Sequence, residues 1–347
     1  MKWYEKENET YHGIIISSRI RLARNLRKYN FPSKLSDDDS IKVIDIISDA
    51  IASASDHAVS LFEKIDMQNI SQIDKIAMME RHIISPIFIR DKIPSALILS
   101  KDESLSIMIN EEDHIRIQSM EIGMNLYTAL ANAYHVDDLL EEKLDVAFDP
   151  SLGYLTACPT NVGTGMRASY MIHLPALETT GKLRFLLDAI GKFGLTVRGM
   201  HGEGSDAQGS LFQISNQITL GVTDEEIIDN LTSVTKQIIE QELVVRNKLI
   251  DEKRLEFEDA VYRSYGILKH VRILPSKEAM TLLSDIKLGL ELGIIKTAEE
   301  KKINIFDLMT CIQPANLQKL QHKELNIEDR DIARATFIRE NLPDLIE

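Results

Sequence analysis

A helix-capping signature at Thr223–Glu226 divides the chain into two parts with different patterns. A threonine followed three residues later by a glutamate forms a capping box, and the apolar residues that follow recur at helical spacing, which predicts a long helix running towards Leu249. Beyond this helix the pattern stays helical, with candidate N-cap residues at Ser276, Thr297 and Asn326. We therefore expect a boundary near residue 250, with one domain over 1–250 and a helical domain over 251–347.

The part before residue 250 mixes helix and strand patterns. An apolar stripe from Ile41 to Ile51 follows Ser36, a typical N-cap residue, and predicts a helix. β-prone runs flank the turn sequence Asp149-Pro150-Ser151-Leu152-Gly153 and predict a hairpin. Ser210–Ser215 follows a glycine-rich loop and predicts a strand. The first domain is therefore expected to contain both a sheet and helices.

Charge and cysteine content exclude several classes of function. Forty basic and 54 acidic side chains give a net charge of -14, which argues against a general affinity for nucleic acid or anionic membranes and favours basic protein partners. Cys158 and Cys311 lie far apart, which fits a reducing compartment and argues against a disulfide scaffold or a zinc site. No apolar run approaches the ~18 residues that span a bilayer, and the start has no signal-peptide core. We expect a cytoplasmic protein.

A basic stretch near the N-terminus has a spacing typical of anion binding. In Ser17-Ser18-Arg19-Ile20-Arg21-Leu22-Ala23-Arg24, an extended backbone places Arg19 and Arg21 on one face because side chains alternate across a strand. Guanidinium groups are always charged and bind phosphate oxygens bidentately, so such a pair suits the phosphates of a nucleotide. For this stretch alone, a solvated basic strand is the alternative interpretation.

Three further segments combine charged and small residues. Asn110–Arg116 places three carboxylates beside an imidazole and an arginine, Cys158–Ser169 carries glycines ahead of Arg167, and Val197–Ser205 carries an arginine and a glutamate in a glycine-rich loop. Glycines let the backbone approach a ligand closely. Taken singly, a surface loop and a glycine turn with a buried cysteine remain alternatives. No G-x-G-x-x-G opens a helix after a strand here, which excludes a dinucleotide fingerprint.

Together these segments resemble the ATP:guanido phosphotransferases, and among them the bacterial protein arginine kinases of the McsB family. The resemblance covers Gly13 to Leu249 and rests on Ser-Ser-Arg-Ile-Arg-Leu-Ala-Arg, Asn-Glu-Glu-Asp-His-Ile-Arg, Cys-Pro-Thr-Asn-Val-Gly-Thr-Gly, Arg-Gly-x-x-Gly-Glu and Gln-Ile-Ser-Asn-Gln-Ile-Thr-Leu-Gly. It implies an α+β fold in which an antiparallel β-sheet flanked by helices precedes a C-terminal helical domain. It also implies transfer of the γ-phosphoryl group of ATP, with Mg²⁺, to a guanidinium.

The resemblance implies roles for individual residues. Glu112 and Glu203 match the carboxylates that hold the acceptor guanidinium, Cys158 matches the thiol beside it, and His82 matches the histidine by the adenine, with a structural histidine as the alternative. The residues implied to line the ATP site are Ser17, Ser18, Arg19, Ile20, Arg21, Arg116, Arg167, Ala168, Ser169, Tyr170, Met171, Arg198, Gly199, Met200, His201, Gly202 and Glu203.

The C-terminal part carries a further motif. Arg330, Asp331, Arg334 and Ala335 form Arg-Asp-x-x-Arg-Ala, which looks like the phosphoarginine-binding motif of the protein arginine kinases. The resemblance implies that Arg330 and Arg334 hold the phosphate and Asp331 the guanidinium, so that the enzyme senses its own product. A salt-bridged exposed helix face is the alternative. In the family this part of the chain also supports homodimerisation.

The implied family role is to mark arginines for the ClpC–ClpP protease, including those of the stress repressor CtsR, with McsA as an activator protein. Small-molecule phosphagen kinases carry a helical domain ahead of the Ser-Ser-Arg segment, whereas 16 residues precede it here. We therefore expect an open acceptor site that admits an arginine displayed on a protein. The alternatives are a phosphagen kinase for free arginine and a phosphoarginine-binding adaptor that has lost catalysis.

Overall fold

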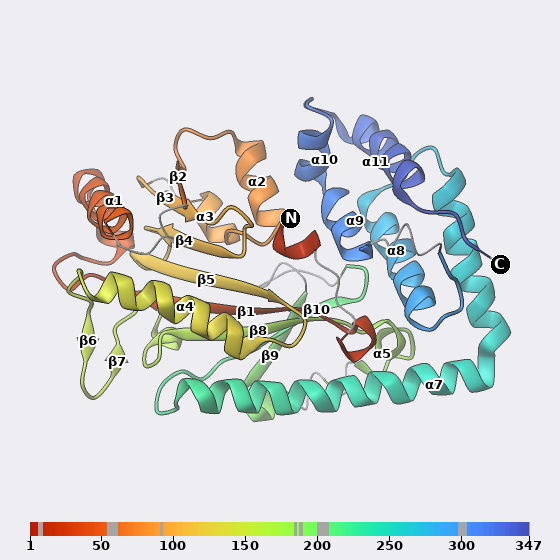
Figure 1. Cartoon of the computed structure of the whole chain (residues 1–347), viewed down its shortest axis with the longest axis horizontal. Coiled ribbons are helices and arrows are strands. Elements are labelled where there is room, and N and C mark those ends of the chain that lie inside the picture. Colours follow the sequence, from red (N-terminus) through yellow and green to blue (C-terminus); the bar gives the residue numbers. More distant parts are fainter. Residues whose placement is uncertain are drawn as a thin grey trace.

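The computed structural model describes residues 1–5, 10–53, 62–90, 93–183, 186, 190–199, 208–297 and 304–346. Within them an antiparallel sheet of eight strands forms the body of the molecule, and a group of helices packs at one end of it (Figure 1). The strand order is β2-β3-β4-β5-β1-β8-β10-β9. An antiparallel sheet with flanking helices, followed by a helical region, confirms the expected fold class.

The strands of this sheet are short apart from the central ones. They are β1 (Ile15–Arg24), β2 (Glu63–Asp66), β3 (Ala96–Leu99), β4 (Leu105–Ile109), β5 (Ile115–Ile122), β8 (Met166–His173), β9 (Leu195–Gly199) and β10 (Leu211–Asn216). A separate hairpin pairs β6 (Phe148–Asp149) with β7 (Gly153–Tyr154), so the predicted hairpin is confirmed.

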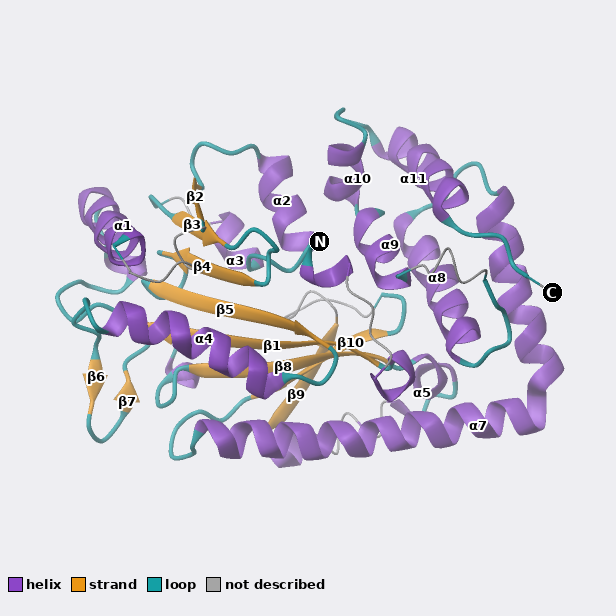
Figure 2. Ribbon diagram, viewed as in Figure 1, coloured by secondary structure: helices purple, strands orange, loops and turns teal. Residues whose placement is uncertain are grey.

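Helices flank the sheet and form the C-terminal region (Figure 2). They are α1 (Asp37–Ala52), α2 (Gln72–Glu80), α3 (Pro86–Arg90), α4 (Leu126–Glu141), α5 (Pro175–Thr179), α7 (Asp224–His270), α8 (Ser276–Glu291), α9 (Ile305–Cys311), α10 (Pro314–Leu320) and α11 (Ile327–Asn341). In the described residues, no helix has the length and apolarity needed to cross a membrane.

Local sequence signals set several helix starts. Ser36 caps α1 by accepting a hydrogen bond from the Asp39 amide, Asn326 caps α11 in the same way, and Thr223 and Glu226 form both bonds of the capping box at α7. These predictions are confirmed. The predicted cap at Ser276 is displaced by one residue, because Pro275 is the N-cap and Ser276 begins α8. Thr297 forms an isolated bridge with Leu345, and residues 298–303, where the helix after this predicted cap would begin, lie outside the described residues, so the cap stays a prediction.

Helix α7 runs past the boundary expected near residue 250. It continues to His270, with a bend at Lys253 where the backbone is not helical. Figure 1 shows α7 passing along the sheet and then turning alongside the C-terminal helices. One apolar cluster fills the space between the sheet and helices α1, α4 and α7, and a second lies among the C-terminal helices. The domain boundary itself stays a prediction.

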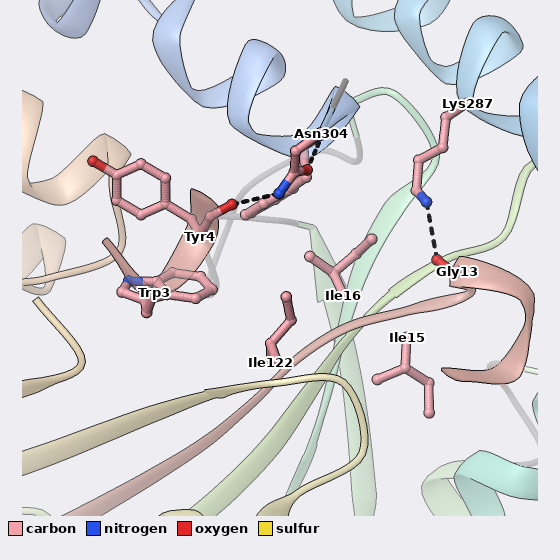
Figure 3. A pocket seen from close by; sticks show the side chains of 9 residues that line it. Trp3, Tyr4, Gly13, Ile15, Ile16, Ile122, Lys287 and Asn304 are labelled. Carbon is pink, nitrogen blue, oxygen red and sulfur yellow. Dashed lines mark hydrogen bonds between the residues drawn. The ribbon is translucent and has the colours of Figure 1, made fainter. Parts of the chain in front are cut away.

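The first residues of the chain lie against the C-terminal helices (Figure 3). Trp3 is 1% exposed, its amide donates to the Asp102 carbonyl, and its ring centroid lies 6.0 Å from that of Phe306 in α9. The Asn304 side-chain amide donates to the Tyr4 carbonyl at 2.6 Å. The N-terminal residues therefore join the sheet to the helical region.

Candidate active site

One face of the sheet carries a row of arginines. Arg21 on β1 lies opposite Arg167 on β8 and Gln118 on β5, while Arg19 lies opposite Ser169. The alternation of side chains across strands also places Arg116 of β5 and Arg198 of β9 on this side. We refer to Arg19, Arg21, Arg116, Arg167 and Arg198 as the arginine face. The predicted sharing of one face by Arg19 and Arg21 is confirmed.

Hydroxyl groups on neighbouring strands contact two members of the arginine face. Arg19 Nε donates to the Ser169 hydroxyl at 3.4 Å, and Arg167 Nη2 donates to the Ser215 hydroxyl at 3.2 Å. Within the described part of the chain, the buried Nε of Arg21 has no hydrogen-bond partner. These side chains are only half-buried, so an anion can reach them.

The electrostatics of the arginine face favour an anionic ligand. Burial lowers the pKa of Arg19 to about 10, with repulsion from Arg167 and Arg116 adding to the shift. Burial also lowers the pKa of Arg21 well below its usual value, and repulsion from Arg19 and Arg167 contributes. A lowered pKa means that the surroundings disfavour the cation. A polyphosphate bound here would bring negative charge to these cations.

Arg116 differs from the others because carboxylates surround it. Its Nη1 lies 2.9 Å from Glu111 Oε1 and its Nη2 lies 2.9 Å from Glu112 Oε2. Burial lowers the pKa of Arg116, but attraction to Glu111, Asp113 and Glu112 outweighs it and the pKa is raised. The Glu111 side chain is fully buried, whereas that of Glu112 is 33% exposed. Glu112 is therefore the carboxylate that a second substrate can contact.

Asp113 joins the predicted acid segment to the predicted thiol segment. Its Oδ1 accepts hydrogen bonds from the Ala157 amide and the Asn25 side chain, both at 2.7 Å. Both segments lie where β1 ends and β5 and β8 begin. Cys158 is half-buried, with its Sγ 3.0 Å from Thr160 Oγ1. The structure thus brings the loops of Glu112 and Cys158 together at one end of the arginine face.

The buried groups that hold these loops come from inside and outside the predicted motifs. Glu111 accepts hydrogen bonds from the Glu112 amide and the Ser85 hydroxyl, and Asn25 Oδ1 accepts from the His114 amide. Glu111 and His114 belong to the Asn110–Arg116 motif, so the motif itself marked them. No sequence signal marked Asn25 or Ser85, because their partners are distant in the chain.

The burial of His114, in the segment Asn110–Arg116, should make the stability of the folded chain dependent on pH. Its Nδ1 accepts from the Leu26 amide and its Nε2 lies 2.8 Å from the Asn30 carbonyl, so the neutral ring fits this place. Burial lowers the pKa of His114 from 6.5 to about 4. As pH falls below 6.5 the unfolded chain binds this proton first, and the free energy of unfolding should drop by about 2 kcal/mol between pH 7 and pH 5.

Urea unfolding at the two pH values checks this prediction. The variant His114→Gln should lose most of the difference, whereas His135→Gln, at an exposed position on α4, should keep it. An equal difference in the wild type and in His114→Gln would contradict the assignment.

His82 lies beside the arginine face but is built into the junction with the helical region. It is 5% exposed, and its ring stacks on Phe306 with centroids 6.5 Å apart. Its carbonyl accepts from the Gln118 side chain at 2.8 Å, and Gln118 lies opposite Arg21. A role beside the adenine stays a prediction.

Several residues predicted to line the ATP site have side chains on the opposite side of the sheet. Ile20, Ala168 and Tyr170 are buried in the core beneath the strands, and the Ser18 hydroxyl donates to the Gly123 carbonyl at 2.6 Å. Successive side chains of a strand point to opposite faces of the sheet. These residues can therefore contact a ligand on the arginine side only through their backbone atoms. Ser17, Ser169 and Met171 lie on the arginine side, and Gly199 ends β9. Met200, His201, Gly202 and Glu203 lie outside the described residues.

The C-terminal motif lies on α11. Arg334 is 1% exposed, and it donates to the carbonyls of Ile312 and Leu274 and to Asp331 Oδ1, the last at 2.5 Å. Ala335 is buried among the C-terminal helices, and Arg330 is half-buried. In this arrangement Arg334 fixes α11 to neighbouring segments. Binding of phosphoarginine by this motif stays a prediction.

Two family models match the chain. The model for the ATP:guanido phosphotransferase, C-terminal catalytic domain, matches residues 42–244. The model for the protein-arginine kinase McsB C-terminal domain matches residues 254–347. Between them they cover the strands of the arginine face other than β1, together with the helical region.

Curated relatives agree with the family models. A protein-arginine kinase of Shouchella clausii is 48% identical over 340 residues, covering 98% of this chain and 94% of the relative. A protein-arginine kinase of a Geobacillus species is 46% identical, covering 98% of this chain and 93% of the relative.

Solved structures share the fold. The duplicated taurocyamine kinase from Schistosoma mansoni, bound to components of a transition-state analogue, is 27% identical with a TM-score of 0.59; the match covers 67% of this chain and 33% of that duplicated chain. Lombricine kinase has a TM-score of 0.60 at 23% identity, over 71% of this chain and 70% of the other. The chain therefore belongs to the protein-arginine kinases, a family of ATP:guanido phosphotransferases.

Proposed function

We propose that this chain transfers the γ-phosphoryl group of ATP to arginine side chains of proteins. The observation that carries the proposal is the arginine face, where burial and mutual repulsion lower the pKa values of Arg19 and Arg21, ending at the loop of the accessible carboxylate Glu112. Its curated relatives are named for the same activity. The relevant chemistry needs an anion site and an acceptor site side by side.

The arginine face suits the donor side of this reaction. Phosphoryl transfer requires in-line alignment of donor and acceptor, together with stabilisation of charge on the equatorial phosphate oxygens. Guanidinium groups fixed in a sheet provide both without covalent participation, and they need no reorganisation as charge develops. Arg19, Arg21 and Arg167 would hold the phosphates, with Arg198 at the edge strand and Arg116 nearest the acceptor.

The carboxylates suit the acceptor side. A guanidinium has a pKa above ~12 and must lose a proton as its nitrogen attacks phosphorus. Glu112 can orient the guanidinium by accepting its hydrogen bonds and then take this proton. Glu203 would supply the second carboxylate and Cys158 the neighbouring thiol. Arg116 holds Glu112 in place, because the two side chains pair at 2.9 Å.

Mg²⁺ would enter with the nucleotide. This ion commonly binds through substrate phosphates, water and one or two carboxylates rather than through a cage of protein ligands. Among the described residues, no group of three or more His, Cys, Asp or Glu side chains is arranged to hold a metal. Glu111, Glu112 and Asp113 are carboxylates that pair with Arg116 of the arginine face.

The finer biological role follows from the family resemblance. We propose that phosphorylation marks substrates for ClpC–ClpP and inactivates the stress repressor CtsR, with McsA as activator. The acidic net charge of -14 favours basic substrates. We further propose a cytoplasmic homodimer in which the motif at Arg330–Ala335 responds allosterically to phosphoarginine.

The test is to supply Mg-ATP with either free arginine or a basic unfolded protein and to detect acid-labile N–P phosphate by ³¹P NMR and mass spectrometry. Phosphate on protein arginines alone is the expected result. Phosphate on free arginine would instead favour a phosphagen kinase. Absence of transfer to either acceptor, when ATP still raises the melting temperature, would favour a phosphoarginine-binding adaptor.

A further inference from the structure

A short segment between β10 and α7 supports the turn that carries Cys158. Thr219 Oγ1 lies 2.9 Å from the Thr160 carbonyl and 2.7 Å from the Val162 carbonyl, and the Thr219 carbonyl accepts from the Thr164 amide at 3.0 Å. Gly163 fits this contact because a Cβ there would lie 2.1 Å from the Thr219 oxygen. Thr219 is therefore directed into the Cys158 turn.

The residues on either side of Thr219 are apolar and exposed. Ile218 is 53% exposed and Leu220 is 52% exposed, as expected when neighbours of an inward side chain in an extended segment point outward. Phe193, at the end of a short 3₁₀ helix, is 56% exposed. A Cβ on the adjoining Gly194 would lie 2.7 Å from Ile218 Cδ1. We call Phe193, Ile218 and Leu220 the apolar ledge.

The backbone of the apolar ledge is fixed before any partner binds. The Gln217 amide donates to the Gly194 carbonyl at 2.9 Å, and the Asn216 side chain donates to the Ile218 carbonyl at 3.1 Å. Single exposed apolar residues are common on protein surfaces, but a contiguous group beside a functional loop marks an interaction site. A surface that is already ordered loses little entropy on binding.

We propose that the apolar ledge binds apolar side chains that flank the target arginine in an extended segment of a substrate protein. The proposal rests on the proposed protein arginine kinase function. Its basis is continuity, since Thr219 contacts the turn of Cys158 while Ile218 and Leu220 lie outside it. An extended chain advances ~3.3 Å per residue, so a bound substrate segment carries its flanking side chains outward from the arginine along the surface beside the Cys158 turn. Apolar side chains are mostly buried in folded proteins. A ledge that binds them would therefore favour unfolded segments as substrates.

The experiment compares two single-arginine peptides of equal length and charge, one with leucines flanking the arginine and one with serines. The wild type should phosphorylate the leucine peptide with about tenfold higher kcat/KM. The double variant Ile218→Ser, Leu220→Ser should lose this preference while keeping its rate on the serine peptide. Phe193→Ser, at the other end of the ledge, should reduce the preference independently.

The control is Val244→Ser, at a 61% exposed position on α7, ~30 Å along the helix from its start. It should retain the wild-type preference. Fluorescence anisotropy of labelled peptides measures binding separately from phosphoryl transfer. Tighter binding of the leucine peptide without phosphorylation of either peptide would refute the proposed function but support peptide binding by the apolar ledge. Equal binding of both peptides by the wild type, or an unchanged preference in the double variant, would contradict the proposal that the apolar ledge binds flanking apolar side chains.

Discussion

Replacement of Glu112 by glutamine should lower kcat for arginine phosphorylation by about a thousandfold, within the range that general acid–base groups contribute. Glutamine keeps the shape and one acceptor oxygen, but it cannot take a proton from the attacking guanidinium. The variant should fold normally, because Arg116 keeps its pairing with the buried Glu111 at 2.9 Å. Single-turnover kinetics at saturating ATP and protein substrate measure the chemical step directly.

The outcome separates a base from a structural carboxylate. Stabilisation of Glu112→Gln by Mg-ATP in thermal melts should be close to that of the wild type, because all five arginines of the arginine face are retained. Glu142→Gln, at an exposed position just after α4, is the matched control and should keep full activity. A kcat within about tenfold of the wild type would remove proton transfer by Glu112 from the mechanism.

Replacement of Arg21 by methionine should have two opposite effects. Activity should fall by about a thousandfold, comparable to the loss of an arginine that stabilises transferring phosphate. The free energy of unfolding without nucleotide should rise by roughly 1 kcal/mol. The substitution removes a buried cation that neighbouring arginines repel. The increase in melting temperature on adding ATP should shrink. Urea unfolding and kinetics on the same preparation test both effects.

Arg24→Met is the contrasting control on the same strand. Arg24 is fully buried, and its Nη2 lies 2.6 Å from Asp137 Oδ2. Loss of this partner would leave a buried carboxylate unpaired, which typically costs about 3 to 5 kcal/mol. If Arg21→Met also destabilised the protein, Arg21 would be a structural arginine and the arginine face would lose its central member.

The elements that the sequence predicted are those with local causes. Capping residues and apolar spacing determine where α1, α7 and α11 begin, and turn residues determine the β6–β7 hairpin. The order of strands in the sheet depends on pairing between segments far apart in the chain, such as β1 with β8. No local pattern contains that information, so the sequence predicted a sheet and the resemblance supplied its antiparallel form.

The candidate site divides in the same way. Alternation predicted the shared face of Arg19 and Arg21, and motif resemblance selected Glu112 and Cys158. Neither identified Asp113 as the group that connects their loops, because its partners Asn25 and Ala157 are fixed only in the folded chain. Resemblance also named Ile20 and Tyr170, since a motif records consecutive residues without recording which face each occupies.

The burial of Trp3 against Phe306 has a consequence for how the protein is made. The N-terminal residues leave the ribosome first, yet Phe306 of α9, which packs against Trp3, is synthesised about three hundred residues later. At a translation rate of ~5 to 20 residues per second, Trp3 is synthesised tens of seconds before Phe306. The sheet can form in that interval, but the junction with the helical region closes only near the end of translation, and a nascent chain stalled earlier would display an aromatic N-terminus to chaperones.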